Sequence, residues 1–127
     1  MGGVARFLGK SAGSQRTGLN HEVIQPGKLN TAPHCHSAEE EIFVVLHGEA
    51  TLLLGDDEHP LRAGHVVARP PGTGIAHAFR AESELTMLSY GTREPNDITY
   101  YPRSDVFALR GVKLIGRLER LTGDDVW

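Results

Sequence analysis

Two histidines separated by a single residue, His34 and His36, are the first feature of the sequence that could support chemistry. On an extended strand, residues two positions apart project to the same side of the chain, with Cα atoms roughly 6.5–7 Å apart. That geometry suits two imidazole ligands on one metal ion. The pair alone is a weak signal, because short polar strands also produce it by chance.

A carboxylate follows the pair at a spacing that requires a turn. Glu41 lies five positions after His36 and would face the opposite side of an unbroken strand. The intervening residues 37–40 are small or polar, as in turns that could reset the alternation. Glu41 then shares a strand face with Phe43 and Val45, where a carboxylate is costly unless it is paired or bound to a metal.

His77 supplies a third imidazole. It shares a strand face with Ile75 and Phe79 and is expected to point into an apolar interior. Each piece has a simpler interpretation, namely a hydrogen-bonded core histidine or, for residues 39–41, a solvated acidic turn. Together they favour a site for one divalent transition metal ion per chain, and three imidazoles with a carboxylate suit iron, manganese, zinc, nickel or copper.

Short β-like runs must position these residues. The chain of 127 residues has the length of one domain. Turn-forming residues separate its apolar runs at about the 8–12-residue spacing of antiparallel sandwiches and barrels. No stretch before residue 105 has a convincing helical period, and residues 112–121 fit a helix or, somewhat better, a strand. The sequence therefore predicts an all-β single domain with strands at residues 19–25, 41–47, 49–54, 59–62, 65–69, 75–80 and 85–90.

The two regions that carry the histidines resemble the two motifs of the cupin superfamily. Residues 27–48, GKLNTAPHCHSAEEEIFVVLHG, contain a glycine, the HxH pair, a glutamate and a later glycine. Residues 64–77, GHVVARPPGTGIAH, contain a glycine, a Pro-x-Gly and a histidine. The combination is much more specific than either motif alone. The resemblance implies a double-stranded β-barrel, the jelly roll of cupin type, that holds a metal ion inside.

By position in these motifs, the resemblance assigns the metal ligands to His34, His36, Glu41 and His77. Glu40 is the alternative to Glu41 if the turn is one residue shorter, although the spacing to the glycine that ends the first motif favours Glu41.

The sequence departs from the family pattern at two places. Ala81 stands where the second motif often ends in asparagine, and His65 stands where an acidic residue commonly follows the glycine. Neither change removes a ligand, so metal binding is still expected. The two changes do, however, weaken the case for close kinship to a well-studied enzyme. Residues 91–106 resemble a less-characterised group of bacterial single-domain cupins.

The expected organisation is an N-terminal arm or loop at residues 1–18, a cupin barrel at residues 19–110 and a C-terminal segment at residues 111–127 that packs on the barrel. Both faces of the strand at residues 41–47 are largely apolar. We therefore expect that the face of Ile42, Val44 and Leu46 is covered, either by a second copy of the chain in a homodimer or by the N-terminal strand.

Composition and charge exclude several classes of protein. The net charge of -3 gives no electrostatic reason to bind nucleic acid or an anionic membrane. The longest apolar run, residues 42–46, is far too short for a membrane-spanning helix. The first residues lack the apolar region of a signal peptide, and the single cysteine, Cys35, cannot form an internal disulfide, so we expect a cytoplasmic protein.

Four protein ligands would leave coordination positions open for water, dioxygen or a chelating substrate. The leading hypothesis is therefore a metal-dependent enzyme that acts on a small polar organic molecule, as a dioxygenase, an isomerase or a decarboxylase. The alternative is a non-catalytic module that binds a small molecule or a metal, because no general base stands out beyond the ligands, Glu39 and Glu40. Arg69 and Arg80 could hold a substrate carboxylate, although Arg80 is expected on the outer face.

Overall fold

The computed structural model describes residues 2–119, and the protein is nearly all β. A single short helix among these residues, α1 (Leu8–Ser11), follows the first strand. The predicted strands correspond to β2 and to β4 through β9, so the all-β prediction is confirmed. The strands are β1 (Gly3–Phe7), β2 (Thr17–Ile24), β3 (Cys35–His36), β4 (Glu41–His47), β5 (Glu49–Leu54), β6 (Asp57–Arg62), β7 (Val66–Arg69), β8 (His77–Ala81), β9 (Leu85–Thr92), β10 (Ile98–Tyr101), β11 (Val106–Leu109) and β12 (Leu114–Arg117).

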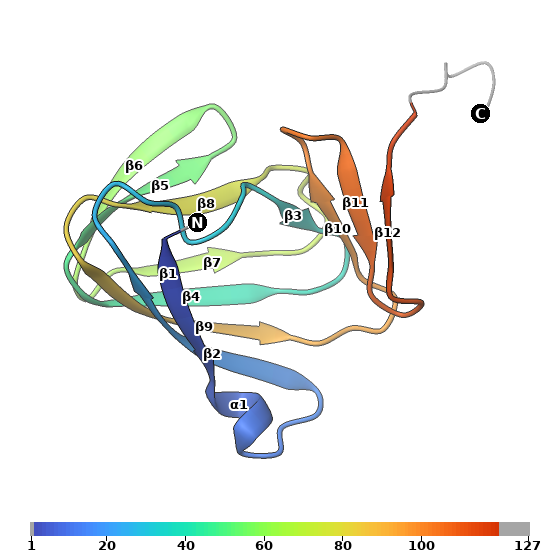
Figure 1. Cartoon of the computed structure of the whole chain (residues 1–127), viewed down its shortest axis with the longest axis horizontal. Helices are drawn as coiled ribbons and strands as arrows, with labels where there is room; N and C mark the ends of the chain where they lie inside the picture. Colours follow the sequence, from blue (N-terminus) through green and yellow to red (C-terminus); the bar gives the residue numbers. More distant parts are fainter. Residues whose placement is uncertain (1, 120–127) are drawn as a thin grey trace.

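These strands form three sheets in a jelly-roll-like β-sandwich. A five-stranded sheet has the order β1-β2-β9-β4-β7, and the three-stranded sheet β6-β5-β8 lies across from it (Figure 1). The third sheet, β12-β11-β10-β3, stands at one end. An isolated antiparallel bridge between His34 and His77 links this third sheet to β8. The predicted jelly roll of cupin type is confirmed, although the sheets do not close into a continuous barrel.

Strand alternation builds the core between the sheets. Phe43 and Val45 of β4 point inward with Leu85 and Met87 of β9, and all four are buried. The ring of Phe43 packs against that of Phe79 with centroids 4.6 Å apart. Burial of each such side chain stabilises the fold by roughly 1.5–3 kcal/mol. This apolar core also contacts the candidate site, because the ring of Phe43 lies against that of His77, with centroids 5.5 Å apart.

The N-terminal residues differ from the expected arm or loop. Gly3–Phe7 pairs antiparallel with β2 over five residues, and α1 follows it directly. All five residues of β1 are exposed. A strand without a buried face has no alternation of apolar and polar residues, so the sequence pattern could not reveal it.

The C-terminal part forms hairpins that the sequence did not predict. β10 pairs with β11, β11 pairs with β12, and β10 also pairs with β3. The preference for a strand at residues 112–121 is correct for Leu114–Arg117. Residues 120–127, which complete the expected C-terminal segment, lie outside the described residues. Within the described part, no helix is long and apolar enough to cross a membrane.

Candidate metal centre

Backbone pairing places His34 and His77 side by side, although they lie far apart in the sequence. The N–H of His34 donates to the carbonyl of His77 at 3.2 Å, and the N–H of His77 donates to the carbonyl of His34 at 2.9 Å. Residues paired in this way carry their side chains on the same face of a sheet. The two rings accordingly lie together, with centroids 4.8 Å apart, and both side chains are buried.

His36 comes to the same place from β3. It lies opposite Thr99 in the pairing of β3 with β10. Its ring meets the ring of His34 edge to face, with centroids 5.0 Å apart. The HxH pair therefore projects to one side of the strand, as the spacing predicts.

The turn after His36 is organised by a residue far along the chain. Asp97 Oδ1 accepts the backbone N–H groups of Ala38 and Glu39, both at 3.0 Å. This turn resets the alternation, so that Glu41 begins β4 facing inward while Glu40 is exposed. The geometry therefore favours Glu41 over Glu40 as the carboxylate of the centre.

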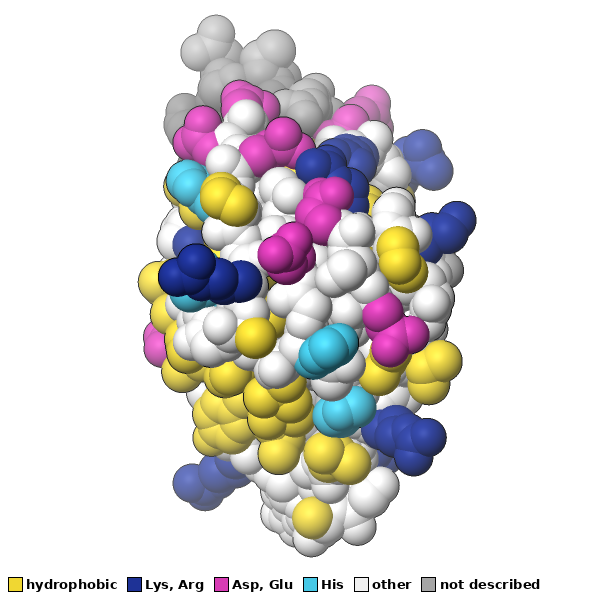
Figure 2. Space-filling model, turned by 90° about the vertical axis from the view of Figure 1, so that its left-hand side faces the viewer, with side chains coloured by type: hydrophobic (Ala, Val, Ile, Leu, Met, Phe, Trp, Pro, Cys, Tyr) yellow, Lys and Arg dark blue, Asp and Glu magenta, His cyan; other side chains and the backbone are white. Residues whose placement is uncertain are grey.

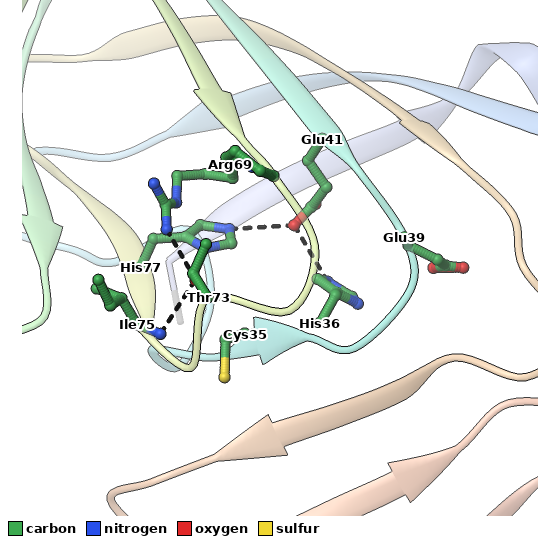
Figure 3. Close-up of a pocket in the computed structure, with 9 residues that line it drawn as sticks. Cys35, His36, Glu39, Glu41, Arg69, Thr73, Ile75 and His77 are labelled. Atoms are coloured by element: carbon green, nitrogen blue, oxygen red, sulfur yellow. Dashed lines mark hydrogen bonds and ion pairs between the residues drawn. The ribbon is translucent and has the colours of Figure 1, made fainter.

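The three imidazoles converge on one carboxylate oxygen, Glu41 Oε1. The Nε2 atoms of His36 and His77 lie 3.1 Å from it, and that of His34 lies 3.9 Å from it. Figure 3 shows the carboxylate of Glu41 between His36 and His77. Despite this proximity, Glu41 Oε1 and His77 Nε2 are buried without a hydrogen bond of acceptable geometry to any described residue. A shared cation would satisfy such atoms.

Hydrogen bonds at the Nδ1 atoms of His34 and His36 determine which ring nitrogen faces Glu41. His34 Nδ1 lies 2.9 Å from the carbonyl oxygen of Ala32, and His36 Nδ1 lies 2.8 Å from Asp97 Oδ2. Because both partners only accept, each Nδ1 donates its proton, and the Nε2 lone pair of the neutral ring faces Glu41. Metal-binding histidines commonly have such outer partners. The residues present therefore fit a divalent transition metal.

The electrostatic environment shifts the pKa values of these groups in opposite directions. Burial alone would lower the pKa of His36, but the neighbouring carboxylates of Glu41 and Asp97 outweigh burial and raise it to about 9. Burial would raise the pKa of Glu41, yet His36 and His77 hold the pKa of that carboxyl well below its usual range. Burial lowers the pKa of His34. A cation bound at this point would compete with the proton on His36 for the same carboxylate.

A cleft beside the centre contains an arginine with an unused donor. Arg69 lies opposite Glu41 in the pairing of β7 with β4. Its Nη2 donates to Thr73 Oγ1 at 3.2 Å, whereas its Nε is buried without an acceptor among the described residues. In Figure 3, the side chain of Cys35 points away from Glu41. Arg69 thus carries a buried N–H that no described residue accepts, at the edge of the candidate metal centre.

Two further expectations have clear outcomes. Arg80 lies on the outer surface as predicted, where it forms ion pairs with Glu58 and Glu82.

The expectation that Ile75 shares an inner strand face with His77 is wrong. β8 begins at His77, and Ile75 is 45% exposed in the preceding loop. Glycines with positive φ in that loop interrupt the alternation on which the expectation depended.

Asp97 is the residue of the centre that sequence reasoning missed. It lies 61 positions from His36, between β9 and β10, and its side chain is fully buried. The only sequence signal available was an Asn-Asp pair typical of a turn. A turn signal alone does not distinguish a buried positioning carboxylate from a solvated one.

We predict that Asp97→Asn weakens metal binding about 10–100-fold, the usual cost of losing an outer partner of a metal-bound histidine. The amide oxygen can still accept the two backbone N–H groups of the turn, but the amide nitrogen cannot accept from His36 Nδ1. Competition titration against a metal-chelating dye measures the effect, with the exposed Asp56→Asn as the control for lost charge. An unchanged affinity would show that Asp97 supports only the turn.

Comparison with known proteins agrees with the fold. A protein-family model described as "Cupin domain" matches residues 20–90. The proposed sugar phosphate isomerase of Acidithiobacillus ferrooxidans is 29% identical with a TM-score of 0.83, and the match covers 94% of this chain and 81% of that one. The sugar phosphate isomerase from a cupin superfamily of Silicibacter pomeroyi is also 29% identical, with a TM-score of 0.84 and coverage of 97% and 82%.

A more distant likeness extends to a variant of salicylate 1,2-dioxygenase from Pseudoaminobacter salicylatoxidans. It is 14% identical with a TM-score of 0.61, and the match covers 71% of this chain and 26% of that one, so the likeness concerns the fold alone. The family match spans more than half of the chain and includes Glu41 and the three histidines that converge on it. The chain therefore belongs to the cupin family.

Proposed function

We propose that this cupin is a metal-dependent enzyme that acts on a small polar organic molecule. The observation that carries the proposal is the convergence of three imidazole Nε2 atoms on Glu41 Oε1. The residues that would hold one divalent transition metal ion are His34, His36, Glu41 and His77. Such an ion, when bound, supplies Lewis-acid or redox chemistry at an oxygen of the substrate.

Side chains around the centre would bind and orient that substrate. The buried Nε of Arg69 can donate to a substrate oxygen. Thr73 Oγ1 already accepts from Arg69 and, at 3.1 Å, from the N–H of Ile75, so its own proton remains to be donated. The ring of Tyr101 lies 5.4 Å from that of His34, and burial raises the pKa of its phenol, which stays a neutral donor at neutral pH.

Isomerisation is the reaction to test first, because two relatives are 29% identical over nearly the whole chain, one described as a sugar phosphate isomerase and the other as a proposed one. Metal-loaded protein would be incubated with aldose and ketose phosphates and followed by proton NMR. Oxygen uptake with small acids and diols would test dioxygenation in parallel. Turnover that requires the metal and is lost in His36→Ala supports the proposal, whereas tight ligand binding without any turnover contradicts it.

A non-catalytic binding module is the second candidate, and the contacts of Glu39 favour it. Glu39 Oε1 accepts from Arg110 Nη2 at 2.7 Å, and its Oε2 accepts the N–H of Glu94 at 3.1 Å. This buried carboxylate cannot act as a general base without breaking those contacts. A site without a free general base can still bind a small molecule, and this favours the binding module.

We also infer a homodimer formed through the outer face of the five-stranded sheet. β1 extends that sheet beyond β2 and does not cover the face of β4. Leu46 is 46% exposed and Tyr90 is 43% exposed on this face. Figure 2 shows that hydrophobic side chains also gather in the lower half of the side that it views, away from most acidic ones. Contiguous exposed apolar surface commonly marks an interface.

Sedimentation velocity at micromolar concentration should therefore show a dimer. Leu46→Glu should weaken association more than tenfold, because an unpaired carboxylate would be buried in the interface. Leu114→Glu, at an exposed leucine on β12, is the matched control. A wild-type chain that sediments only as a monomer would rule the dimer out.

A further inference from the structure

A second cavity, of about 390 Å³, lies beside the candidate metal centre, and its charged lining is entirely basic. Lys10 from α1, Arg93 after β9 and Arg110 after β11 contribute the positive charge. Hydroxyl and amide groups, among them those of Gln15 and Asn20, complete its polar lining. Among the described residues that line this cavity, none is a carboxylate.

Glycines leave space for Arg93 next to the centre. Glu41 pairs with Gly91 of β9, and Gly91 pairs with Gly18 of β2. The two positions next to Glu41 on the inner face of the sheet therefore carry no side chain. The guanidinium of Arg93 occupies that space, because a Cβ on Gly18 would overlap it. A Cβ on Gly91 would lie 3.3 Å from Arg93 Nη1 and 3.5 Å from Glu41 Cγ. Arg93 therefore stands between the basic cavity and the carboxylate on which the histidines converge.

Glu39 forms a second connection between the two sites. It lines the cleft that contains His36, Glu41 and His77. Its buried carboxylate is also paired with Arg110, which lines the basic cavity, at 2.7 Å. The basic cavity thus adjoins the candidate metal centre at Arg93 and at Glu39.

The charges of the cavity match a phosphate group. Glu39 neutralises Arg110, whereas Lys10 and Arg93 form no ion pair within residues 2–119. Two unpaired cations complement a phosphomonoester, which carries a charge of about −1.5 to −2 at pH 7. Arginine can also bind phosphate oxygens through two parallel N–H groups. The volume falls within the roughly 300–1,000 Å³ of small-molecule sites.

We infer that the cavity of Lys10, Arg93 and Arg110 binds the phosphate group of the substrate, whose other end reaches the metal centre past Arg93. The substrate class is then a phosphorylated small polyol or sugar. Only the statement about the reacting end rests on the proposed function, because phosphate binding in the cavity requires neither metal nor turnover.

Calorimetric titration of the metal-free, full-length protein tests this, with inorganic phosphate, ribose 5-phosphate and unphosphorylated ribose as probes. Both phosphates should bind and ribose should not. The double variant Lys10→Gln with Arg93→Gln should weaken phosphate binding about 100-fold, since each lost charge-assisted contact accounts for about tenfold or more. The matched control, Arg6→Gln with Lys28→Gln, removes the same charge from exposed positions outside the cavity and should change affinity less than twofold.

Manganese-loaded protein supplies an independent measurement of position. The phosphorus NMR resonance of ribose 5-phosphate should broaden near the paramagnetic ion, and the double variant should remove most of the broadening. The inference is overturned if neither phosphate binds the wild-type protein, if the double variant binds as tightly as the control, or if binding appears only with metal and is insensitive to the double variant. Phosphate binding without metal uptake or turnover would instead count against the proposed function alone.

Discussion

His77→Ala is expected to remove most of the bound metal, and so are His34→Ala and His36→Ala. Each of these side chains places an Nε2 atom within 3.9 Å of Glu41 Oε1. Loss of an atom that binds the metal directly should exceed the roughly 10–100-fold cost of losing an outer partner. Metal content per chain, measured by inductively coupled plasma mass spectrometry after gel filtration, gives the result.

Exposed residues of the same type provide the controls for these variants. His59→Ala changes a solvated histidine on β6 and should leave the metal content unchanged. Glu41→Gln should weaken binding, while Glu40→Gln, at an exposed position, should not. Any one of the three histidine variants that retains one ion per chain would remove that residue from the set of ligands.

The stabilising effect of the metal is expected to grow with pH. In the metal-free protein, Glu41 and Asp97 raise the pKa of His36 from its ordinary value of 6.5 to about 9. A raised pKa contributes stability that is fully present below pH 6.5 and is lost as the pH rises through about 9. The contribution is roughly 3 kcal/mol, since one pKa unit corresponds to about 1.4 kcal/mol and the side chain is only 11% exposed.

The metal-loaded protein should respond differently, because bound imidazoles are neutral. Above pH 6.5 neither its folded nor its unfolded state takes up protons at His36, so its stability should be nearly constant. Below about pH 6.5, the unfolded histidines bind protons and the metal is lost, with more than one proton taken up per ion by about pH 5.

Urea unfolding at pH 5, 6.5, 7.5 and 9, with chelator or with the ion found in the purified protein, measures both curves. The difference in unfolding free energy between them should widen from pH 6.5 to pH 9 and vanish toward pH 5. Asp97→Asn should flatten the curve of the metal-free protein, because one of the two carboxylates that hold the His36 proton becomes neutral. A difference that does not change with pH would contradict the role given to His36.

The residues that carry the centre could be found from the sequence because their spacing is local. His34 and His36 share a strand face by alternation alone, and the small residues after them indicate the turn that brings Glu41 inward. The core positions of β4 follow from the same alternation. Where the alternation is interrupted, at the glycine loop before β8, the expectation for Ile75 failed.

The missed residues depend on contacts between distant parts of the chain. Asp97 reaches His36 only because β10 pairs with β3, a strand of two residues that no periodicity reveals. Arg93 lies beside Glu41 because Gly91 and Gly18 come together through the pairing of β9 with β2. A single sequence does not specify which strands are neighbours, so the basic cavity beside the centre could not be predicted.

The most direct test of the account is the metal content of the wild-type protein purified without a histidine tag. Elemental analysis should find one divalent transition metal ion per chain, and X-ray absorption should show imidazole nitrogen and carboxylate oxygen around it. Removal of the ion at pH 7.5 should lower the melting temperature, and its return should restore it. Protein that contains no stoichiometric metal, and whose melting curve is the same with and without chelator, would contradict the central claim.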